Sequence, residues 1–237
     1  MTRDERPLHA VPAIVWGALI LALAAQLAWR AVQAPSTPQA SDLPPAPSVQ
    51  ALRLASFGEP NALARVTMLY LQAFDSGATN TRPYRQLDYT RLIGWLEAIL
   101  ALDPRSEYPL FTAARIYAEN PDAAKSRLML EFIYREFFAD PDHRWPWLAH
   151  AALLAKHRLH DLPLARRYAA AIDRSTRSPD VPLWARQMEI FILEDMNEVE
   201  AARVLLGGLL ESGRIRDADE ARFLQRKLEE LESRTGR

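Results

Sequence analysis

Three short segments of the chain begin alike and recur at nearly equal intervals, and this repetition constrains the fold more than any other feature. Their prolines are 37 and 36 residues apart, at Pro109, Pro146 and Pro182. A second set precedes them at intervals of 37 and 38 residues, at Pro104, Pro141 and Pro179. Proline is tolerated in the first turn of a helix and disfavours helix at the residue before it. We therefore expect the earlier proline of each pair to follow the end of one helix and the later proline to begin the next.

The spacing of apolar residues predicts an all-α fold beyond residue 50. Apolar side chains recur there at intervals of three and four residues, and no run alternates as a half-buried strand would. Three such stripes are Val66-Leu69-Tyr70-Phe74, Leu92-Trp95-Leu96-Ile99 and Leu224-Leu228-Leu231. A period in the thirties with two helices per unit is typical of stacked helical hairpins, because stacking buries the apolar face that a single hairpin leaves open.

The two later units also match each other internally. The segment DLPLARRYAAAI, from Asp161, aligns with EVEAARVLLGGL, from Glu198, at an offset of 37 residues. The same offset pairs Trp147 with Trp184 and Ala165 with Ala202. Each unit thus has a tryptophan in its first helix and a small residue early in its second helix.

This pattern resembles the tetratricopeptide repeat over residues 88–213. The chain departs from that family in its period of 36–38 residues and in the turn glycine, which His160 and Asn197 replace. The resemblance implies an α-solenoid of three to four hairpins, in which the first helices line a groove that binds a protein segment. In this chain those helices are expected at residues 109–119, 146–159 and 183–195.

We expect the helical repeat domain to span residues 50–236. Its units are expected at 58–104, 105–141, 142–179 and 180–216, followed by a capping helix at 217–234 with an acidic outer face. In the leading unit, helices at 60–75 and 88–102 flank a long loop, and Asp88 is a plausible N-cap of the second.

The N-terminal part of the chain predicts a membrane anchor. Residues 11–29, VPAIVWGALILALAAQLAW, carry no charge, and a helix of this length rises about 28 Å, close to the thickness of a bilayer core. We expect an anchor at residues 11–32. The alternative, a cleaved signal peptide, usually has a shorter apolar run.

The charges beside the anchor predict its orientation. Arg3 and Arg6 precede it in the short tail of residues 1–10, and Arg30 alone follows it closely. The positive-inside rule therefore favours a cytoplasmic N-terminus and a periplasmic repeat domain on a bacterial inner membrane. Residues 33–49 hold five prolines and predict an extended linker.

Composition excludes several classes of function. The chain has no cysteine, which rules out disulfides, thiolate metal sites and thiol nucleophiles. Its net charge of −1 gives no basic field for nucleic acid. No phosphate-binding, nucleophile-elbow or zinc-protease motif occurs, so we predict no enzymatic activity, cofactor or small-molecule substrate.

Three of the five histidines lie close together in the sequence, at His150, His157 and His160. They leave a metal-binding protein as the alternative function. Against it, His150 and His157 are two helical turns apart, about 10 Å, which is too far for one ion. Moreover, His150 and His157 align with Gln187 and Glu194 one unit later, as expected for a polar helix edge.

We therefore predict a membrane-anchored scaffold for protein–protein interaction, such as an accessory or assembly factor of an envelope complex. Its partners are proteins, themselves membrane-associated, and its N-terminal helix contacts the lipid bilayer. The candidate groove residues are Arg115, Trp145, His150, His157, Arg186, Gln187 and Glu194. Trp95, Trp147 and Trp184 are expected in the core, whereas Trp145 suits binding and packing equally.

Overall fold

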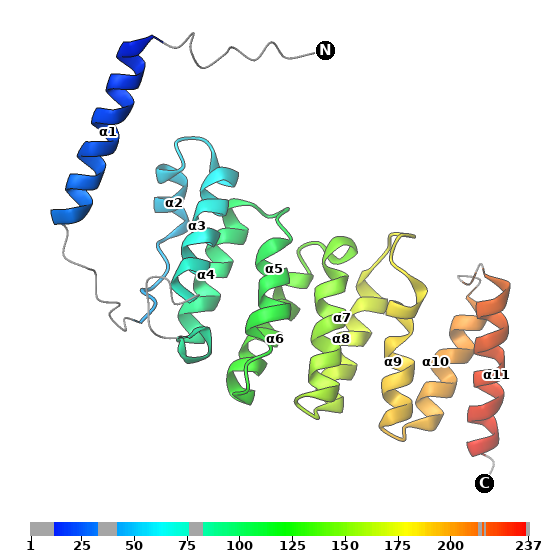
Figure 1. Ribbon diagram of the computed structural model, residues 1–237. Helices are drawn as coiled ribbons and strands as arrows, with labels where there is room; N and C mark the ends of the chain where they lie inside the picture. Colours follow the sequence, from blue (N-terminus) through cyan, green and yellow to red (C-terminus); the bar gives the residue numbers. More distant parts are fainter. Residues whose placement is uncertain (1–11, 33–41, 76–82, 213–214, 216, 236–237) are drawn as a thin grey trace, which may run out of the picture. The chain divides into compact units, whose positions relative to one another are not determined.

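A computed structural model describes residues 12–32, 42–75, 83–212, 215 and 217–235 (Figure 1). This part of the chain contains eleven α-helices and no strand, which confirms the all-α prediction. The chain divides into two compact units, residues 1–40 and 41–237. The predicted N-terminal tail, residues 1–10, and residues 33–41 of the predicted linker lie outside the described residues.

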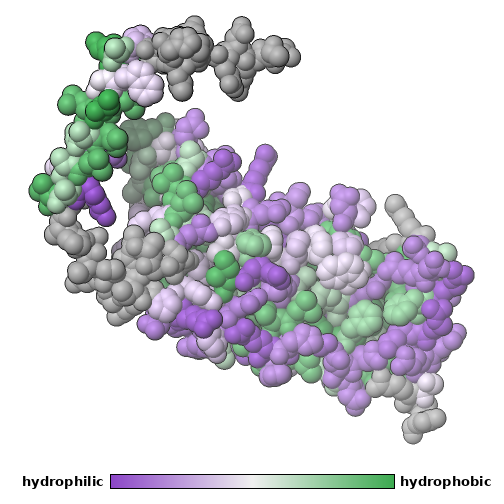
Figure 2. Space-filling view, viewed as in Figure 1, coloured by the Kyte–Doolittle hydropathy of each residue, from purple (hydrophilic) through white to green (hydrophobic). Residues whose placement is uncertain are grey.

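The first unit contains one long apolar helix, α1, at Ala13–Val32. Its 20 residues include no buried side chain, and Figure 2 shows apolar side chains along it. At 1.5 Å per residue the helix is about 30 Å long. It is the one helix of the described residues that is long and apolar enough to cross a membrane.

The second unit is a row of antiparallel helices (Figure 1). They are α2 (Val49–Ala55), α3 (Pro60–Asp75), α4 (Tyr89–Leu102), α5 (Tyr108–Thr112), α6 (Ala123–Phe137), α7 (Pro141–His157), α8 (Leu162–Ser175), α9 (Leu183–Asp195), α10 (Val199–Glu211) and α11 (Ala218–Thr235). A short 3₁₀ turn, η2 (Tyr84–Gln86), precedes α4, and a π-helical stretch, η3 (Ala113–Tyr117), continues α5. Each helix packs mainly against its neighbours in the chain.

Aspartate side chains cap the N-termini of three helices, each of which is the second helix of its unit. Asp88, as expected, caps α4 by accepting the backbone N–H of Thr90 at 2.8 Å. Asp122 and Asp161 cap α6 and α8 in the same way. Each carboxylate satisfies backbone donors that have no partner inside the helix.

The turns between paired helices use a left-handed backbone where the repeat pattern has glycine. His160 has φ +52° and Asn197 has φ +60°. A side chain at such a φ is less favourable than glycine, although asparagine and histidine are found there more often than most residues. The backbone therefore keeps the turn although the glycine is absent.

The expected role of Pro146 is wrong. Helix α7 begins at Pro141, so Pro146 lies inside it, whereas Pro109 lies in the first turn of α5 and Pro182 is the residue before α9. Asp140, which precedes Pro141, has φ −155° and ψ 76°, outside the helical region that a residue before proline avoids. The earlier proline of this pair is therefore the one that starts the helix.

The second half of the predicted linker is packed against α4. Leu43 is fully buried, and its carbonyl accepts a hydrogen bond from Arg91 Nη1 at 2.9 Å. The carbonyl of Pro44 accepts one from the indole nitrogen of Trp95 at 2.8 Å. An extended proline-rich segment leaves its carbonyls free to accept such bonds, so Leu43 and Pro44 of the predicted linker are packed against the helical body.

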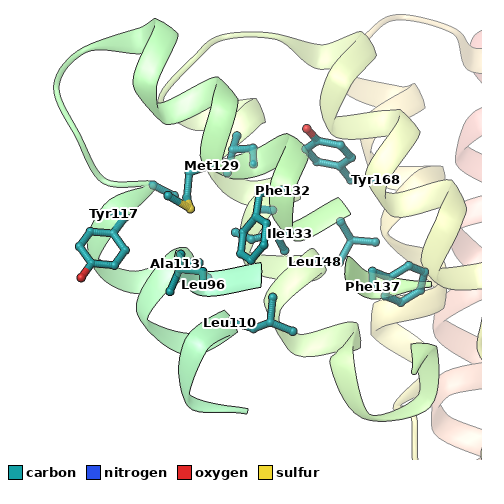
Figure 3. Close-up of a cluster of buried hydrophobic side chains, with 14 of the residues drawn as sticks. Leu96, Leu110, Ala113, Tyr117, Met129, Phe132, Ile133, Phe137, Leu148 and Tyr168 are labelled. Carbon is teal, nitrogen blue, oxygen red and sulfur yellow. The ribbon is translucent and has the colours of Figure 1, made fainter. Parts of the chain in front are cut away.

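The core is continuous from α2 to α9, and Figure 3 shows a part of it that includes Leu96 of α4, Phe132 of α6 and Leu148 of α7. A smaller cluster joins α9, α10 and α11. The predicted stripe on α4 is buried, and Leu224 and Leu231 of α11 are buried as predicted. The stripe predicted on α3 is wrong, because Val66, Leu69 and Tyr70 are exposed; α3 buries Ala64, Thr67, Met68 and Leu71 instead.

Candidate functional site

The solvent-facing sides of α5 with η3, α7 and α9 form the surface on which the sequence placed the groove. We call this surface the first-helix face. On α7 it consists of Pro146, His150, Leu153 and His157, which recur at intervals of four, three and four residues and so share one side of the helix. Leu153 is 44% exposed at its centre. An apolar side chain with polar neighbours is thus presented to solvent.

The corresponding residues of α9 are 38 positions further along the chain. They are Trp184, Met188, Phe191 and Asp195. Trp184 is 52% exposed, which corrects the expectation that it lies in the core. Met188 of this set is only 8% exposed and packs in the core, so Trp184, Phe191 and Asp195 are the members that reach solvent.

Aromatic rings connect neighbouring helices along the first-helix face. Tyr108 stacks on Phe111 within α5, with ring centroids 5.9 Å apart, and Phe111 meets Trp147 of α7 edge-on at 5.6 Å. Trp145 of α7 meets Trp184 of α9 edge-on at 5.4 Å. Trp145 is therefore partly buried between helices, and the exposed ring is that of Trp184.

Three of the predicted groove residues are held by internal contacts. Gln187 is 4% exposed, and its amide donates to Glu220 of α11 at 3.1 Å. Glu194 pairs with Lys227 of α11 at 2.8 Å, and this hydrogen bond raises the pKa of Lys227. Arg186 Nη2 donates to the carbonyl of Ser178 at 2.6 Å. These contacts hold the three side chains against neighbouring parts of the chain.

Of the remaining predicted residues, Arg115 of η3 and His150 of α7 lie beside each other. Arg115 Nη1 is 3.4 Å from His150 Nδ1, and His150 Nε2 is 3.8 Å from Glu119 Oε1. Burial, followed by the positive charge of Arg115, lowers the pKa of His150. The imidazole is therefore neutral at physiological pH and separates a cation from an anion. His157 is exposed at the end of α7.

The three histidines of the metal-binding alternative are not brought together. His150 is in contact with Arg115 and Glu119, while His160 is in the turn that follows α7. Among the described residues, no group of three histidine, aspartate or glutamate side chains is placed to hold a metal ion.

Arginines from three units surround a hollow at one edge of the first-helix face. It has a volume of about 310 Å³, and its lining includes Arg85, Arg115 and Arg158 beside Tyr84 and Glu119. Only Arg115 was predicted, because the other two lie in turns, where helical spacing gives no signal. The hollow presents three cations and one carboxylate, an arrangement that suits an acidic group of a partner.

An apolar hollow of about 410 Å³ lies between α3 and the start of α5. Its lining includes Met68, Leu69, Ile99, Tyr108 and Pro109. It extends the apolar part of the first-helix face towards the first unit of the row. Apolar hollows flanked by a few polar groups are the usual receptors for the side chains of a bound segment.

A comparison of the chain with protein-family models, curated proteins and solved structures gave no match.

Proposed function

We propose that this protein is a membrane-anchored scaffold whose helical body, of the tetratricopeptide-like type, binds a protein partner on the first-helix face. The observation that carries the proposal is a series of exposed apolar side chains on α5, α7 and α9, namely Phe111, Leu153 and Trp184, at 37%, 44% and 52% exposure. Apolar anchors of this kind at the centre of a surface, surrounded by polar residues, are typical of protein interfaces.

The charges around these anchors indicate the chemistry of the partner. Arg115 and the neighbouring Arg85 and Arg158 lie at one edge of the face. A segment that places apolar side chains on Phe111 and Leu153 and an acidic residue at this edge satisfies both features. An amphipathic helix or an extended segment with one acidic end meets this requirement.

The proposed setting is the inner membrane of a bacterium, with the body in the periplasm. Support comes from α1, which is long enough to span the apolar core of a bilayer, and from the arginines before it. An anchor limits the body to a thin layer beside the membrane, which raises its effective concentration for partners in the same membrane. A role in an envelope complex, as an accessory or assembly factor, follows from this arrangement.

The test is affinity capture of the full-length protein from mildly solubilised native membranes. Leu153→Arg and Trp184→Arg each place a charge at an exposed apolar anchor, and we expect about a tenfold or larger loss of captured partner. Leu128→Arg is the matched control, because Leu128 is 45% exposed on α6, a second helix. Partner recovery that is the same for all three variants would refute the first-helix face as the binding site.

A further inference from the structure

The end of α2 and the turn that joins it to α3 present two bulky apolar side chains to solvent (Figure 1). Leu54, in the last turn of α2, is 81% exposed, and Phe57, in the turn itself, is 96% exposed. We call these two residues the apolar tip. Neither of them lines the two hollows of the candidate site. The apolar tip is therefore separate from the surface that the proposed function uses.

The backbone of this turn fixes the exposed ring in place. Phe57 has φ +50° and Gly58 has φ +92°, and a bulky residue rarely adopts the left-handed conformation because it is costly. The turn is nevertheless closed by its own hydrogen bonds. The backbone N–H of Glu59 donates to the carbonyl of Ser56 at 2.9 Å, and the Ser56 hydroxyl donates to the carbonyl of Arg53 at 2.7 Å. Polar groups that are satisfied locally are what a segment in contact with lipid requires.

The equivalent turns further along the row differ from the apolar tip. The turn between α4 and α5 is polar and consists of Asp103, Pro104, Arg105, Ser106 and Glu107. In the loop before α9 the large apolar residue, Val181, is 3% exposed. Phe138, which follows α6, is 48% exposed, but its ring packs edge-on against Tyr134 and Phe137. The apolar tip thus departs from this pattern at the end of the row that follows the anchor in the chain.

The length of chain between anchor and body limits how far the apolar tip can be from a bilayer. Trp29 and Arg30 lie near the end of α1, where such residues favour the membrane interface. Ten residue steps separate Val32, the last residue of α1, from Asp42. A chain of this length spans at most about 36 Å in any conformation. If α1 is the anchor, as the proposed function holds, the start of the body stays within that distance of the bilayer surface.

The apolar tip is close to the start of the body. The carbonyl of Leu43 accepts a hydrogen bond from Arg91 near the N-terminus of α4, and Arg53, the neighbour of Leu54, contacts the carbonyl of Ala101 near its C-terminus. Ten residues of helix separate these two contacts, which is about 15 Å. The chain between anchor and body is more than twice as long, so it allows the apolar tip to reach the bilayer.

The size and charge of the apolar tip favour lipid over a protein partner. Two side chains on a turn provide much less than the area of about 800 Å² that each partner contributes to a standard protein interface. A lipid surface needs no matching shape, and phenylalanine and leucine are typical of side chains that enter its interface. Arg53 and Glu59 flank the apolar tip with opposite charges. Contact with lipid therefore depends on the apolar side chains and needs no anionic headgroup.

We propose that the apolar tip inserts into the interface of the bilayer that holds α1. The body is then attached to the membrane at two points, the anchor and the apolar tip. The second contact restricts the rotation that a single attachment allows and holds the α2–α3 end of the row at the membrane surface. This inference rests on the proposed anchoring and goes beyond the proposed binding of a protein on the first-helix face.

Nitroxide labelling tests the insertion directly, because the chain has no cysteine of its own. Ala55→Cys places the label between the two residues of the apolar tip and leaves both intact. Full-length protein is reconstituted in phosphatidylcholine vesicles, and the label's collision rates with oxygen, which concentrates in lipid, and with a water-soluble nickel chelate are compared. We expect the oxygen-to-nickel ratio to be several-fold higher than for Arg226→Cys, an exposed position of α11. Equal ratios at the two positions would refute the insertion.

A charge at the apolar tip should remove this signal. In the Ala55→Cys protein we expect Phe57→Asp to lower the ratio to the value found at Arg226→Cys. Aspartate adopts the left-handed backbone more readily than phenylalanine, so this variant should fold at least as well. Gln50→Asp adds the same charge at another exposed position of α2 and is the matched control, for which the ratio should stay high. An unchanged ratio in Phe57→Asp would overturn the proposal.

A label in α1 separates failure of this inference from failure of the anchor. Leu21 is 72% exposed near the middle of α1, and Leu21→Cys should give a high oxygen-to-nickel ratio in the same vesicles. A high ratio there with a low ratio at Ala55→Cys would refute insertion of the apolar tip and leave the anchor intact. A low ratio at Leu21→Cys would refute the anchor, and with it the attachment on which insertion of the apolar tip depends.

Discussion

At the scale of single residues, Asn120 joins the first two units through a buried network. Asn120 is 1% exposed, and its Nδ2 donates to Tyr89 Oη at 2.9 Å while its Oδ1 accepts the backbone N–H of Asp122 at 2.9 Å. Tyr89 Oη in turn donates to the carbonyl of Tyr117 at 3.0 Å. Buried polar groups that are all satisfied in this way fix one arrangement of the helices.

The contribution of Tyr89 to the free energy of unfolding should depend on pH, and replacement of Tyr89 should reveal this dependence. Burial raises the pKa of Tyr89 to about 12, whereas an unfolded tyrosine titrates near about 10. Folding favours the neutral phenol, so its contribution is complete below about pH 10 and is lost as the pH rises towards 12. Tyr89→Phe should cost about 1 kcal/mol near neutral pH, and this cost should shrink in alkaline solution.

Urea unfolding of the detergent-solubilised chain at about pH 8 and about pH 11 measures the effect. Tyr168→Phe serves as a second variant, because burial also raises the pKa of Tyr168, whose hydroxyl is bonded to Glu131 at 3.1 Å. Other titrating groups cancel when each variant is compared with wild type at the same pH. If the difference in unfolding free energy between variant and wild type were the same at both pH values, the raised tyrosine pKa would not contribute to stability as proposed.

The sequence predicted residues on regular faces better than residues in contacts between units. Leu92, Trp95 and Leu96 were predicted as a buried stripe and are buried. Gln187 was predicted on a water-facing edge because it aligned with His150, but its amide reaches Glu220 of α11. Helical spacing gives the side of a helix, and it contains no information about a polar residue 33 positions away.

At the scale of the helices, α7 depends on contacts near its N-terminus. The carboxylate of Asp142 accepts the backbone N–H of Ser178 at 2.9 Å and that of Arg177 at 2.6 Å. These two bonds lower the pKa of Asp142. The first turn of α7 is thereby attached to the loop before α9, and a helix that starts at Pro146 would lack this attachment.

Pro146 destabilises α7 because it lies inside the helix, and its replacement should therefore stabilise the protein. Proline lacks the N–H that would bond the carbonyl four residues earlier. We expect Pro146→Ala to raise the free energy of unfolding by about 1 kcal/mol or more. Pro163→Ala is the matched control, because Pro163 lies in the first turn of α8, where no such bond is lost. Equal effects in urea unfolding would contradict this account.

The sequence was sufficient to predict that a helix is present at α7, but it was not sufficient to predict the residue at which α7 begins. Both prolines of its pair suit a first turn, and local rules do not rank Pro141 against Pro146. The choice depends on Asp142 and Arg144. Arg144 is 5% exposed, and its guanidinium donates to the carbonyls of Glu136 at 2.6 Å and Pro104 at 2.8 Å. Glu136 belongs to α6 and Pro104 to the turn between α4 and α5, so both contacts come from outside α7.

At the scale of the whole body, the interior has two parts that differ in size. The larger cluster spans α2 to α9, and the smaller one holds seven buried residues from α9, α10 and α11. Gly207 and Gly208 of α10 occupy the positions that Ala170 and Ala171 have in α8, and a β-carbon at either glycine would meet open space. Glycine also weakens a helix by about 1 kcal/mol relative to alanine. The sequence predicted the succession of hairpins, but this division depends on packing between them.

This division of the core predicts that the C-terminal hairpin, formed by α10 and α11, opens independently of the remaining helices. Leu224 is 1% exposed in the smaller cluster, so Leu224→Ala should cost about 2–4 kcal/mol there. Hydrogen exchange followed by mass spectrometry should then show faster exchange in α10 and α11 and unchanged exchange in α6 to α8, because local opening reports the stability of each cooperative unit. Phe223→Ala, at the neighbouring position but 47% exposed, should leave both regions unchanged. Equal acceleration across α6 to α11 would mean that the two clusters unfold as one unit, and the C-terminal hairpin would then be as stable as the core it caps.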